Sequence, residues 1–390
     1  MAKPDGSAEG GDFLSAVIRT FPYRNVIVFG DSLSDIGTKW MQPLGRIAGS
    51  TGGMTVSPGG RFSDCRNWSD YLYEAATGQT LVAGTAENTR KLSEPHKRLR
   101  AGCRCLDGSE QWFRYANYAE GGACAGSPTS LIGRIGLGTF RDQVTRFQHD
   151  MRQFAPVSRD GPGDRRFLFL VWFGANDIYT DGQRAAAMPG VVTRVMKRRQ
   201  EIVNVLHAAG VGTEDDAVRF VFMGMALPTS AARYQAQFER ANRRLQDGEI
   251  HGLRGRIQLL WKSRMRIVRE MFDARMEALS QLAIAALIYN DNLSGSVVAP
   301  DLYVDMQHHL SESAVDAMMQ HYRLLQCNEP KGWSRMYMSA ADYDSIMADV
   351  MVPFSTSDEA HPTDRVYRYM WERAVSPALR NAGVQFGNFR

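Results

Sequence analysis

The sequence lacks a long apolar run and an N-terminal export signal. None of its 390 residues belongs to a stretch of about 18 apolar residues, the length that spans a bilayer. The start of the chain is polar and glycine-rich, without a basic head followed by an apolar stretch. We therefore expect no transmembrane segment, a disordered segment over 1–20, and a protein that is cytoplasmic or exported by a non-classical route.

Cysteines are few, and their number is odd. They are Cys65, Cys103, Cys105, Cys124 and Cys327. An odd count without an export signal argues against a disulfide framework, so we expect reduced thiols. Cys103, Cys105 and the nearby His96 are three candidate zinc ligands, but zinc takes four and no fourth is evident. We therefore expect no metal site.

A strong charge bias is also missing. The formal net charge is +4, which is too small to favour a nucleic acid as partner. Basic residues nevertheless cluster in three runs: Arg90, Lys91, Lys97, Arg98, Arg100 and Arg104; Lys197, Arg198 and Arg199; and Lys262, Arg264, Arg266 and Arg269. Solvated faces are the ordinary explanation for such runs, and peripheral contact with an anionic membrane surface is the alternative.

Apolar, β-branched and aromatic runs are present and predict buried parallel strands. They occupy 25–29, 167–173 and 218–224, with a short fourth at 302–305. Apolar residues at helical spacing predict a helix over 191–209, which Gly210 can cap, and a second helical region covers 256–286. Alternating strands and helices indicate an α/β fold with a parallel sheet and helices on both faces.

We expect a single domain over 21–390. The stretch 84–114 is polar and basic without clear periodicity, and we interpret it as a surface insertion. The sequence of 293–354 gives no strong indication of helices or strands. In parallel sheets of this kind the ligand crevice lies at the carboxyl ends of the strands, so candidate site residues are sought directly after the predicted strands.

Ser32 is the candidate nucleophile, because it follows the first predicted strand and a Gly-Asp turn. A serine hydroxyl needs a base to take its proton, and an imidazole such as that of His361 titrates near neutral pH. Asp358 lies three residues before His361, a spacing that puts both side chains on one side of a turn or helical start. We expect Asp358 to accept from one ring nitrogen while the other nitrogen faces Ser32.

Acyl transfer also needs N–H donors aimed at the developing oxyanion. Asn176 follows the second predicted strand and can supply a side-chain N–H, while Gly122 can supply a backbone N–H. The amide of Ser32 is the third donor. Each residue taken alone has an ordinary use in a turn, cap or loop. Their joint occurrence in this order favours a catalytic site.

Four segments resemble the sequence blocks of the GDSL/SGNH lipase/esterase family. They are 29–35 (FGDSLSD), 117–123 (NYAEGGA), 172–177 (WFGAND) and 358–363 (DEAHPT). Between the first two, 60–63 (GRFS) resembles a G-R-F segment of many members. The resemblance runs from Val26 to about Arg373. It assigns the nucleophile to Ser32, the acid and base to Asp358 and His361, and the oxyanion hole to Ser32, Gly122 and Asn176.

The Ala-Glu-Gly-Gly and Gly-Ala-Asn-Asp forms are similar to those of bacterial phospholipases and glycerophospholipid–cholesterol acyltransferases, some of which are effectors delivered into host cells. The resemblance implies a flavodoxin-like three-layer α/β/α fold, no cofactor and no metal. The expected reaction is hydrolysis of a lipid acyl ester through an acyl-serine intermediate. Transfer of the acyl group to a sterol, and the identity of any activating protein partner, stay open.

Two alternatives to a lipid esterase remain. One is a carbohydrate esterase or deacetylase, since one fold hosts several substrates. The other is a non-catalytic lipid- or protein-binding module that retains the fold. The presence of all five candidate residues, Ser32, Gly122, Asn176, Asp358 and His361, weighs against the second alternative.

Overall fold

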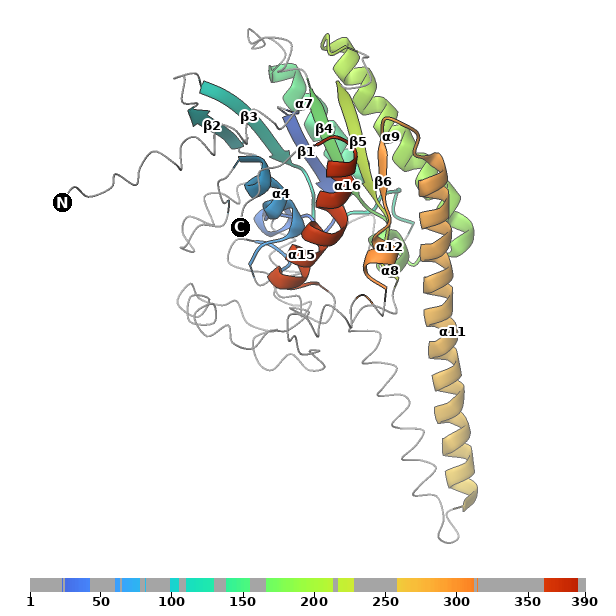
Figure 1. Ribbon diagram of the computed structural model, residues 1–390. Helices are drawn as coiled ribbons and strands as arrows, with labels where there is room; N and C mark the ends of the chain where they lie inside the picture. Colours follow the sequence, from blue (N-terminus) through green and yellow to red (C-terminus); the bar gives the residue numbers. More distant parts are fainter. Residues whose placement is uncertain are drawn as a thin grey trace, which may run out of the picture.

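The structure of the chain, a computed structural model, has a central sheet with helices on both faces (Figure 1). It describes residues 23, 25–42, 60–63, 65–77, 81, 99–104, 110–129, 138–154, 166–212, 217–227, 258–311, 314 and 361–384. The segment 1–20, for which the sequence predicts disorder, lies outside the described residues.

The described strands form one sheet. They are β1 (Asn25–Gly30), β2 (Leu99–Arg104), β3 (Glu110–Asn117), β4 (Phe167–Trp172), β5 (Val218–Met223) and β6 (Leu302–Val304). The order is β2-β3-β1-β4-β5-β6, in which β2 is antiparallel to β3 and all other neighbours are parallel. Numbered in chain order, the parallel strands follow 2-1-3-4-5, the flavodoxin-like order, whose switch point lies between β1 and β4.

The register of β1 brings three strand ends to one edge of the sheet. Val28 of β1 lies opposite Asn117, the last residue of β3. Gly30, the last residue of β1, lies opposite Trp172, the last residue of β4. The segments that follow β1, β3 and β4 therefore leave the sheet close together, at the edge where parallel sheets bind ligands.

Helices cover both faces of the sheet. The longer ones are α4 (Trp68–Thr77), α7 (Phe140–Phe154), α9 (Met188–Ala208) and α11 (Gln258–Ser296); the shorter ones are α2 (Thr38–Met41), α8 (Ala175–Tyr179), α12 (Met306–His309), α15 (Asp364–Met370) and α16 (Ser376–Asn381). The 3-10 turn η3 (Ala185–Ala187) precedes α9, and the π-helical turn η6 (Trp371–Val375) joins α15 to α16. Among the described helices, none is both long and apolar enough to cross a bilayer.

Alternate residues of the strands face two separate cores. On β1, Val26 and Val28 pack in one core with residues of α4, α15 and α16, while Ile27 and Phe29 pack in the other with residues of α7, α9 and α11. This alternation follows from the two-residue period of a strand. The result is three layers, α/β/α, as the sequence predicts.

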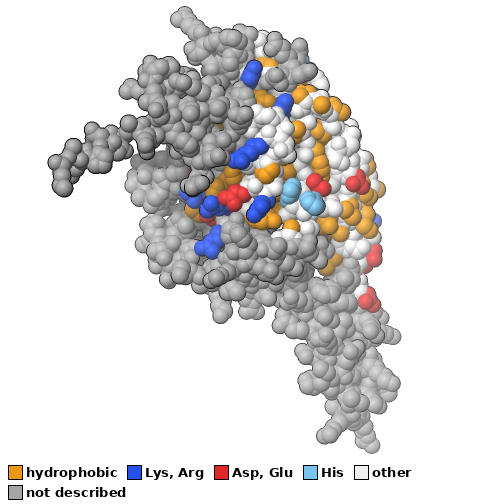
Figure 2. All heavy atoms as spheres, in the orientation of Figure 1, with side chains coloured by type: hydrophobic (Ala, Val, Ile, Leu, Met, Phe, Trp, Pro, Cys, Tyr) orange, Lys and Arg blue, Asp and Glu red, His pale blue; other side chains and the backbone are white. Residues whose placement is uncertain are grey.

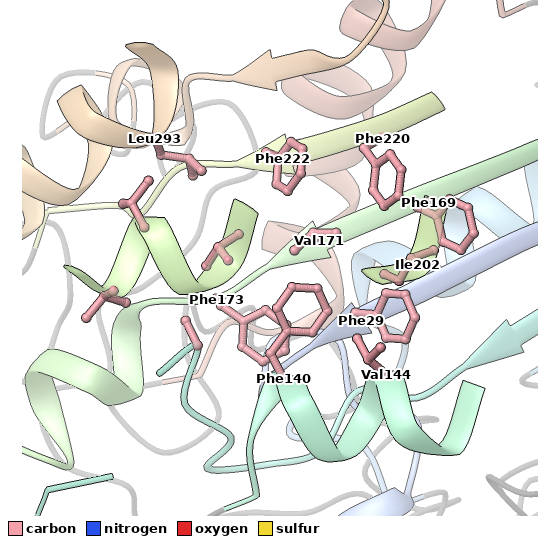
Figure 3. Packing of buried hydrophobic residues seen from close by; sticks show 14 of the residues in the cluster. Phe29, Phe140, Val144, Phe169, Val171, Phe173, Ile202, Phe220, Phe222 and Leu293 are labelled. Atoms are coloured by element: carbon pink, nitrogen blue, oxygen red, sulfur yellow. The ribbon is translucent and has the colours of Figure 1, made fainter. Parts of the chain in front are cut away.

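Aromatic rings from neighbouring strands stack in the second core (Figure 3). The ring of Phe169 lies between those of Phe29 and Phe220, with centroid separations of 6.1 Å and 4.6 Å. Such pairs contribute about 0.5–1.5 kcal/mol each beyond the area that they bury. This ladder fixes the central strands side by side and so holds the loops at their ends.

The strand and helix predictions from apolar periodicity are confirmed. Each of the four predicted strands matches β1, β4, β5 or β6 to within a residue at either end. The helix predicted over 191–209 is α9, and Gly210 has the left-handed φ of +77° expected of a C-terminal cap. The helical region predicted over 256–286 is α11, which continues ten residues further.

The polar stretch 84–114 differs from the prediction in its second half. The sequence indicates no strand there, yet the structure has β2 and the first residues of β3, and β3 pairs directly with β1. These two strands are defined by the pairing of their backbones with neighbouring strands, and their sequences show no apolar pattern that would predict them. Residues 84–98 and 105–109, also assigned to the insertion, lie outside the described residues.

Candidate active site

Segments that follow three adjacent strands bring the candidate residues together. Ser32 comes two residues after β1, Gly122 five residues after β3, and Asn176 four residues after β4. His361 lies three residues before α15, in the layer that packs on the same sheet. Their convergence at the carboxyl edge is the arrangement that the strand order predicts.

The hydroxyl of Ser32 and the imidazole of His361 are in hydrogen-bond contact. Oγ of Ser32 lies 2.8 Å from Nε2 of His361, although 329 positions separate the residues. Both side chains are nearly buried, with exposed fractions of 8% and 6%. A hydroxyl within reach of an imidazole nitrogen, in a site that admits little water, can lose its proton on attacking a carbonyl carbon.

A tight turn presents Ser32. The preceding carboxylate, Asp31, accepts from the backbone N–H of Leu33 at 3.0 Å, and its carbonyl accepts from Ser34 N at 3.1 Å. Gly30 is held from the other side, because the side-chain amide of Gln143 on α7 bonds both its N–H and its carbonyl. The nucleophile therefore sits on a turn that is closed by its own hydrogen bonds and fastened to α7.

The ring of His361 packs against Phe62. Their ring centroids are 5.0 Å apart and the planes are tilted by 36°. Phe62 is held in place by its neighbour Arg61, whose guanidinium makes a bidentate, fully buried ion pair with Asp70 at 2.6 Å and 2.7 Å. The GRFS segment thus supplies the surface on which the imidazole rests.

The partner predicted for the other ring nitrogen is not among the described residues. Since Nε2 of His361 faces Ser32, Nδ1 is the nitrogen that a carboxylate would bond. Asp358 lies outside the described residues, so its pairing with His361 stays a prediction from the sequence.

The candidate oxyanion donors occupy suitable backbone positions. Gly122 has a φ of +80°, a left-handed conformation that glycine adopts without strain. Asn176 lies in the first turn of α8, where its Nδ2 donates to the carbonyl of Ala123 at 3.2 Å and its Oδ1 accepts from Thr180 at 2.8 Å. Because the amide nitrogen carries two hydrogens, Asn176 can bond Ala123 and still offer an N–H to a substrate oxygen.

Buried carboxylates surround this edge of the sheet. Burial raises the pKa of Asp31 to about 7, although the Leu33 N–H and the nearby His361 act against the rise. Burial also raises the pKa of Asp35 and that of Asp177 to about 6, and backbone N–H donors oppose the rise at both. Perturbed carboxyl groups of this kind cluster at functional sites.

Carboxylates additionally hold the loop that follows Gly122. Asp177 accepts from the backbone N–H groups of Ala125 and Gly126 at 2.7 Å and 2.9 Å. Asp181 accepts from the N–H and hydroxyl of Thr129 at 2.7 Å and 2.9 Å. The loop is thereby fastened to α8 and to the residues just after it, the same region that carries Asn176.

Sequence reasoning did not single out several of these supporting residues. Asp35 lies inside the first sequence block, three positions after Ser32. That position was the one feature of the sequence that could have marked Asp35 as part of the site. Gln143 was detectable only as a polar residue on the apolar face of α7, between the buried Phe140 and Val144. The contact of Phe62 with His361 joins positions about 300 residues apart, and no local pattern reveals it.

The described residues contain no group of three or more His, Cys, Asp or Glu side chains that could hold a metal ion. Cys65 and Cys124 are buried and form no disulfide with another described residue, and burial raises the pKa of the Cys124 thiol well above its usual range. The side chains of Cys103 and Cys105, together with His96 and Cys327, lie outside the described part of the chain. The only reactive pair that the geometry brings together at this edge, among the described residues, is Ser32 with His361.

The chain matches one family model, described as GDSL-like Lipase/Acylhydrolase, over residues 26–374. A comparison with curated proteins finds no match. The matched range includes the turn of Ser32, the loops of Gly122 and Asn176, and the segment of His361.

Proposed function

Because the chain belongs to the GDSL-like lipase/acylhydrolase family and is in general terms a serine ester hydrolase, we propose that it cleaves lipid acyl esters through an acyl–Ser32 intermediate. The observation that supports this most is the 2.8 Å contact between Ser32 Oγ and His361 Nε2 at the carboxyl edge of the sheet. The lipid class is supported by the forms of the second and third sequence blocks, which are similar to those of phospholipases and lipid acyltransferases.

The first half-reaction forms the acyl-enzyme. Ser32 Oγ attacks the ester carbonyl carbon while His361 Nε2 takes the hydroxyl proton. The negative charge on the carbonyl oxygen is held by N–H groups of Ser32, Gly122 and Asn176, and the positive imidazolium is stabilised by Asp358. The C–O bond then breaks, and His361 gives its proton to the departing alcohol oxygen.

The second half-reaction releases the acyl group. A water molecule gives its proton to His361 and attacks the acyl carbon, which frees a carboxylic acid and restores Ser32. A sterol hydroxyl that binds in place of water follows the same steps and yields a steryl ester. The two outcomes use the same residues, so the acceptor is decided by water exclusion and by the binding of the alcohol.

Peripheral contact with an anionic membrane surface is part of the proposal. The run Lys262, Arg264, Arg266 and Arg269 lies within α11. On α9, by contrast, Arg198 pairs with Glu201 and Arg199 pairs with Asp301, so these arginines serve the fold. Figure 2 shows a described surface on which basic, acidic and hydrophobic side chains are mixed. The basic run of α11 and the run between Arg90 and Arg104 are therefore the two candidates for this contact, and the side chains of both lie outside the described residues.

The test is lipid mass spectrometry of products from the purified chain, with Ser32→Ala as control. Phosphatidylcholine vesicles with and without cholesterol are the lipid arms, and an acetylated sugar is the third arm. Release of free fatty acid by the wild type alone supports the lipid hydrolase, and steryl ester supports acyl transfer. Deacetylation of the sugar without action on vesicles would overturn the lipid assignment in favour of the carbohydrate alternative.

A further inference from the structure

The glycine that carries the oxyanion donor is held through its neighbour, Gly121. The backbone N–H of Gly121 donates to Oδ2 of Asp35 at 2.7 Å. The carboxylate of Asp35 is fully buried and also accepts from the backbone N–H groups of Gly37, Thr38 and Lys39 at 2.7 Å, 2.6 Å and 3.1 Å. A single side chain thus bonds the segment that follows Ser32 and the loop that follows β3.

Phe62 packs against Gly121. A Cβ atom added to Gly121 would lie 2.4 Å from Cε2 of Phe62, so the ring rests directly on the glycine backbone. The same ring packs on His361. The loop that carries Gly121 and the imidazole of His361 therefore pack against the same aromatic ring.

We propose that Asp35 is a positioning residue of the oxyanion hole, which fixes the amide of Gly122 relative to the amide of Ser32, and that the packing of Phe62 on Gly121 assists it. The two amides belong to different loops, and a hole for one oxygen atom requires a fixed separation between them. Asp35 is three residues from Ser32 and is bonded to the residue next to Gly122, so it sets that separation. This inference rests on the proposed acyl–Ser32 chemistry.

Asp35→Asn removes acceptors without changing the size of the side chain. Each carboxylate oxygen accepts two backbone N–H groups, and an amide NH₂ group can accept none. When the NH₂ group of the asparagine faces Gly121, that loop loses its bond. We expect kcat to fall about 10- to 100-fold with KM within about threefold, since small misplacement of a stabilising group slows the reaction without weakening substrate binding.

The decisive measurement is the infrared carbonyl stretch of the acyl–Ser32 intermediate, formed from a slowly hydrolysed ester that is ¹³C-labelled at its carbonyl carbon. Hydrogen bonds in the oxyanion hole lower this frequency. We expect a higher or split band in Asp35→Asn. The matched control is Asp301→Asn, which makes the same substitution at a buried carboxylate just before β6, where Oδ1 accepts from the backbone N–H of Phe220 at 3.0 Å. It should keep the wild-type frequency and kcat.

An Asp35→Asn variant that acylates with wild-type kcat and an unshifted carbonyl band would overturn the positioning role while leaving the proposed function intact. A wild-type chain that forms no acyl–Ser32 would overturn the proposed function and this inference with it. Should Asp35→Asn fail to fold, Phe62→Leu tests the positioning of the same loop, because the Phe62 ring packs on Gly121. Its carbonyl band is expected to shift in the same direction, and an unshifted band there would equally overturn the proposal.

Discussion

The central strands and the loops at their carboxyl ends bury opposite kinds of side chain. In the strands, rings such as Phe169 stack between their neighbours, and removing them from water stabilises the fold. In the loops, burial raises the pKa of Asp31, Asp35 and Asp177 and so disfavours their charged forms. The strands therefore supply stability. The loops hold ionisable groups in buried positions that suit catalysis, and this placement lowers the stability of the fold.

The largest expected effect lies in the loops and concerns activity alone. Ser32→Ala and His361→Ala should each lower kcat by at least about 10⁴-fold, because the nucleophile and base act as one unit. Both side chains lie at the end of the sheet rather than in its cores, so the melting temperature should change by less than about 3 °C. Ester hydrolysis rates and thermal melts check this. Near-wild-type turnover in either variant would remove the proposed mechanism.

The largest expected effect in the strands concerns stability alone. Phe169→Ala should lower the free energy of unfolding by about 3–5 kcal/mol, because it opens a cavity in the stacked rings and the ring is fully buried. The fraction of molecules that stays folded should retain wild-type kcat. Denaturant unfolding together with active-site titration separates the two quantities. A Phe169→Ala variant that keeps its stability but loses activity would contradict the conclusion that the strands serve stability and the loops serve catalysis.

A smaller effect is expected at the oxyanion hole. Asn176→Ala should lower kcat about 100-fold, or about 3 kcal/mol of barrier, with little change in KM. Its bonds to Ala123 and Thr180 are local, so the loss of stability should stay near 1 kcal/mol. Steady-state kinetics on one ester substrate provide the test. A rise in KM with unchanged kcat would assign Asn176 to ground-state binding instead.

The last expected effect is a gain in stability that depends on pH. The pKa of Asp31 rises from 3.8 to about 7 on folding, so its favourable contribution is complete below pH 4 and is lost as the pH rises to 7. Asp31→Asn keeps an oxygen for the Leu33 N–H but cannot ionise. We expect the variant to exceed the wild type in unfolding free energy by about 4 kcal/mol at pH 8 and to match it at pH 4. Equal stability at pH 8 would show that the buried charge costs nothing.

The same contrast explains how much of the molecule the sequence predicts. Strands such as β1 and β4 are continuous apolar runs, and the periodicity that buries them is visible locally. The strands β2 and β3 were missed because Leu99–Arg104 and Glu110–Asn117 mix charged, polar and aromatic residues, and their pairing is defined by backbone contacts.

In the loops, the sequence predicts which residues meet but not what holds them. Ser32 and His361 were paired from residue chemistry and sequence blocks, and the structure brings them into contact. The support from Asp35 and Phe62 is a tertiary arrangement without a local signature. Asp358 lies outside the described residues, so its role stays a prediction.

The most direct test of the central claim is intact-protein and peptide mass spectrometry after treatment with a fluorophosphonate, which captures only an activated nucleophile. The account predicts one adduct per chain, located on Ser32, and none in Ser32→Ala or His361→Ala. An adduct on another residue, or an unmodified wild-type chain that is folded and still hydrolyses esters, would contradict it.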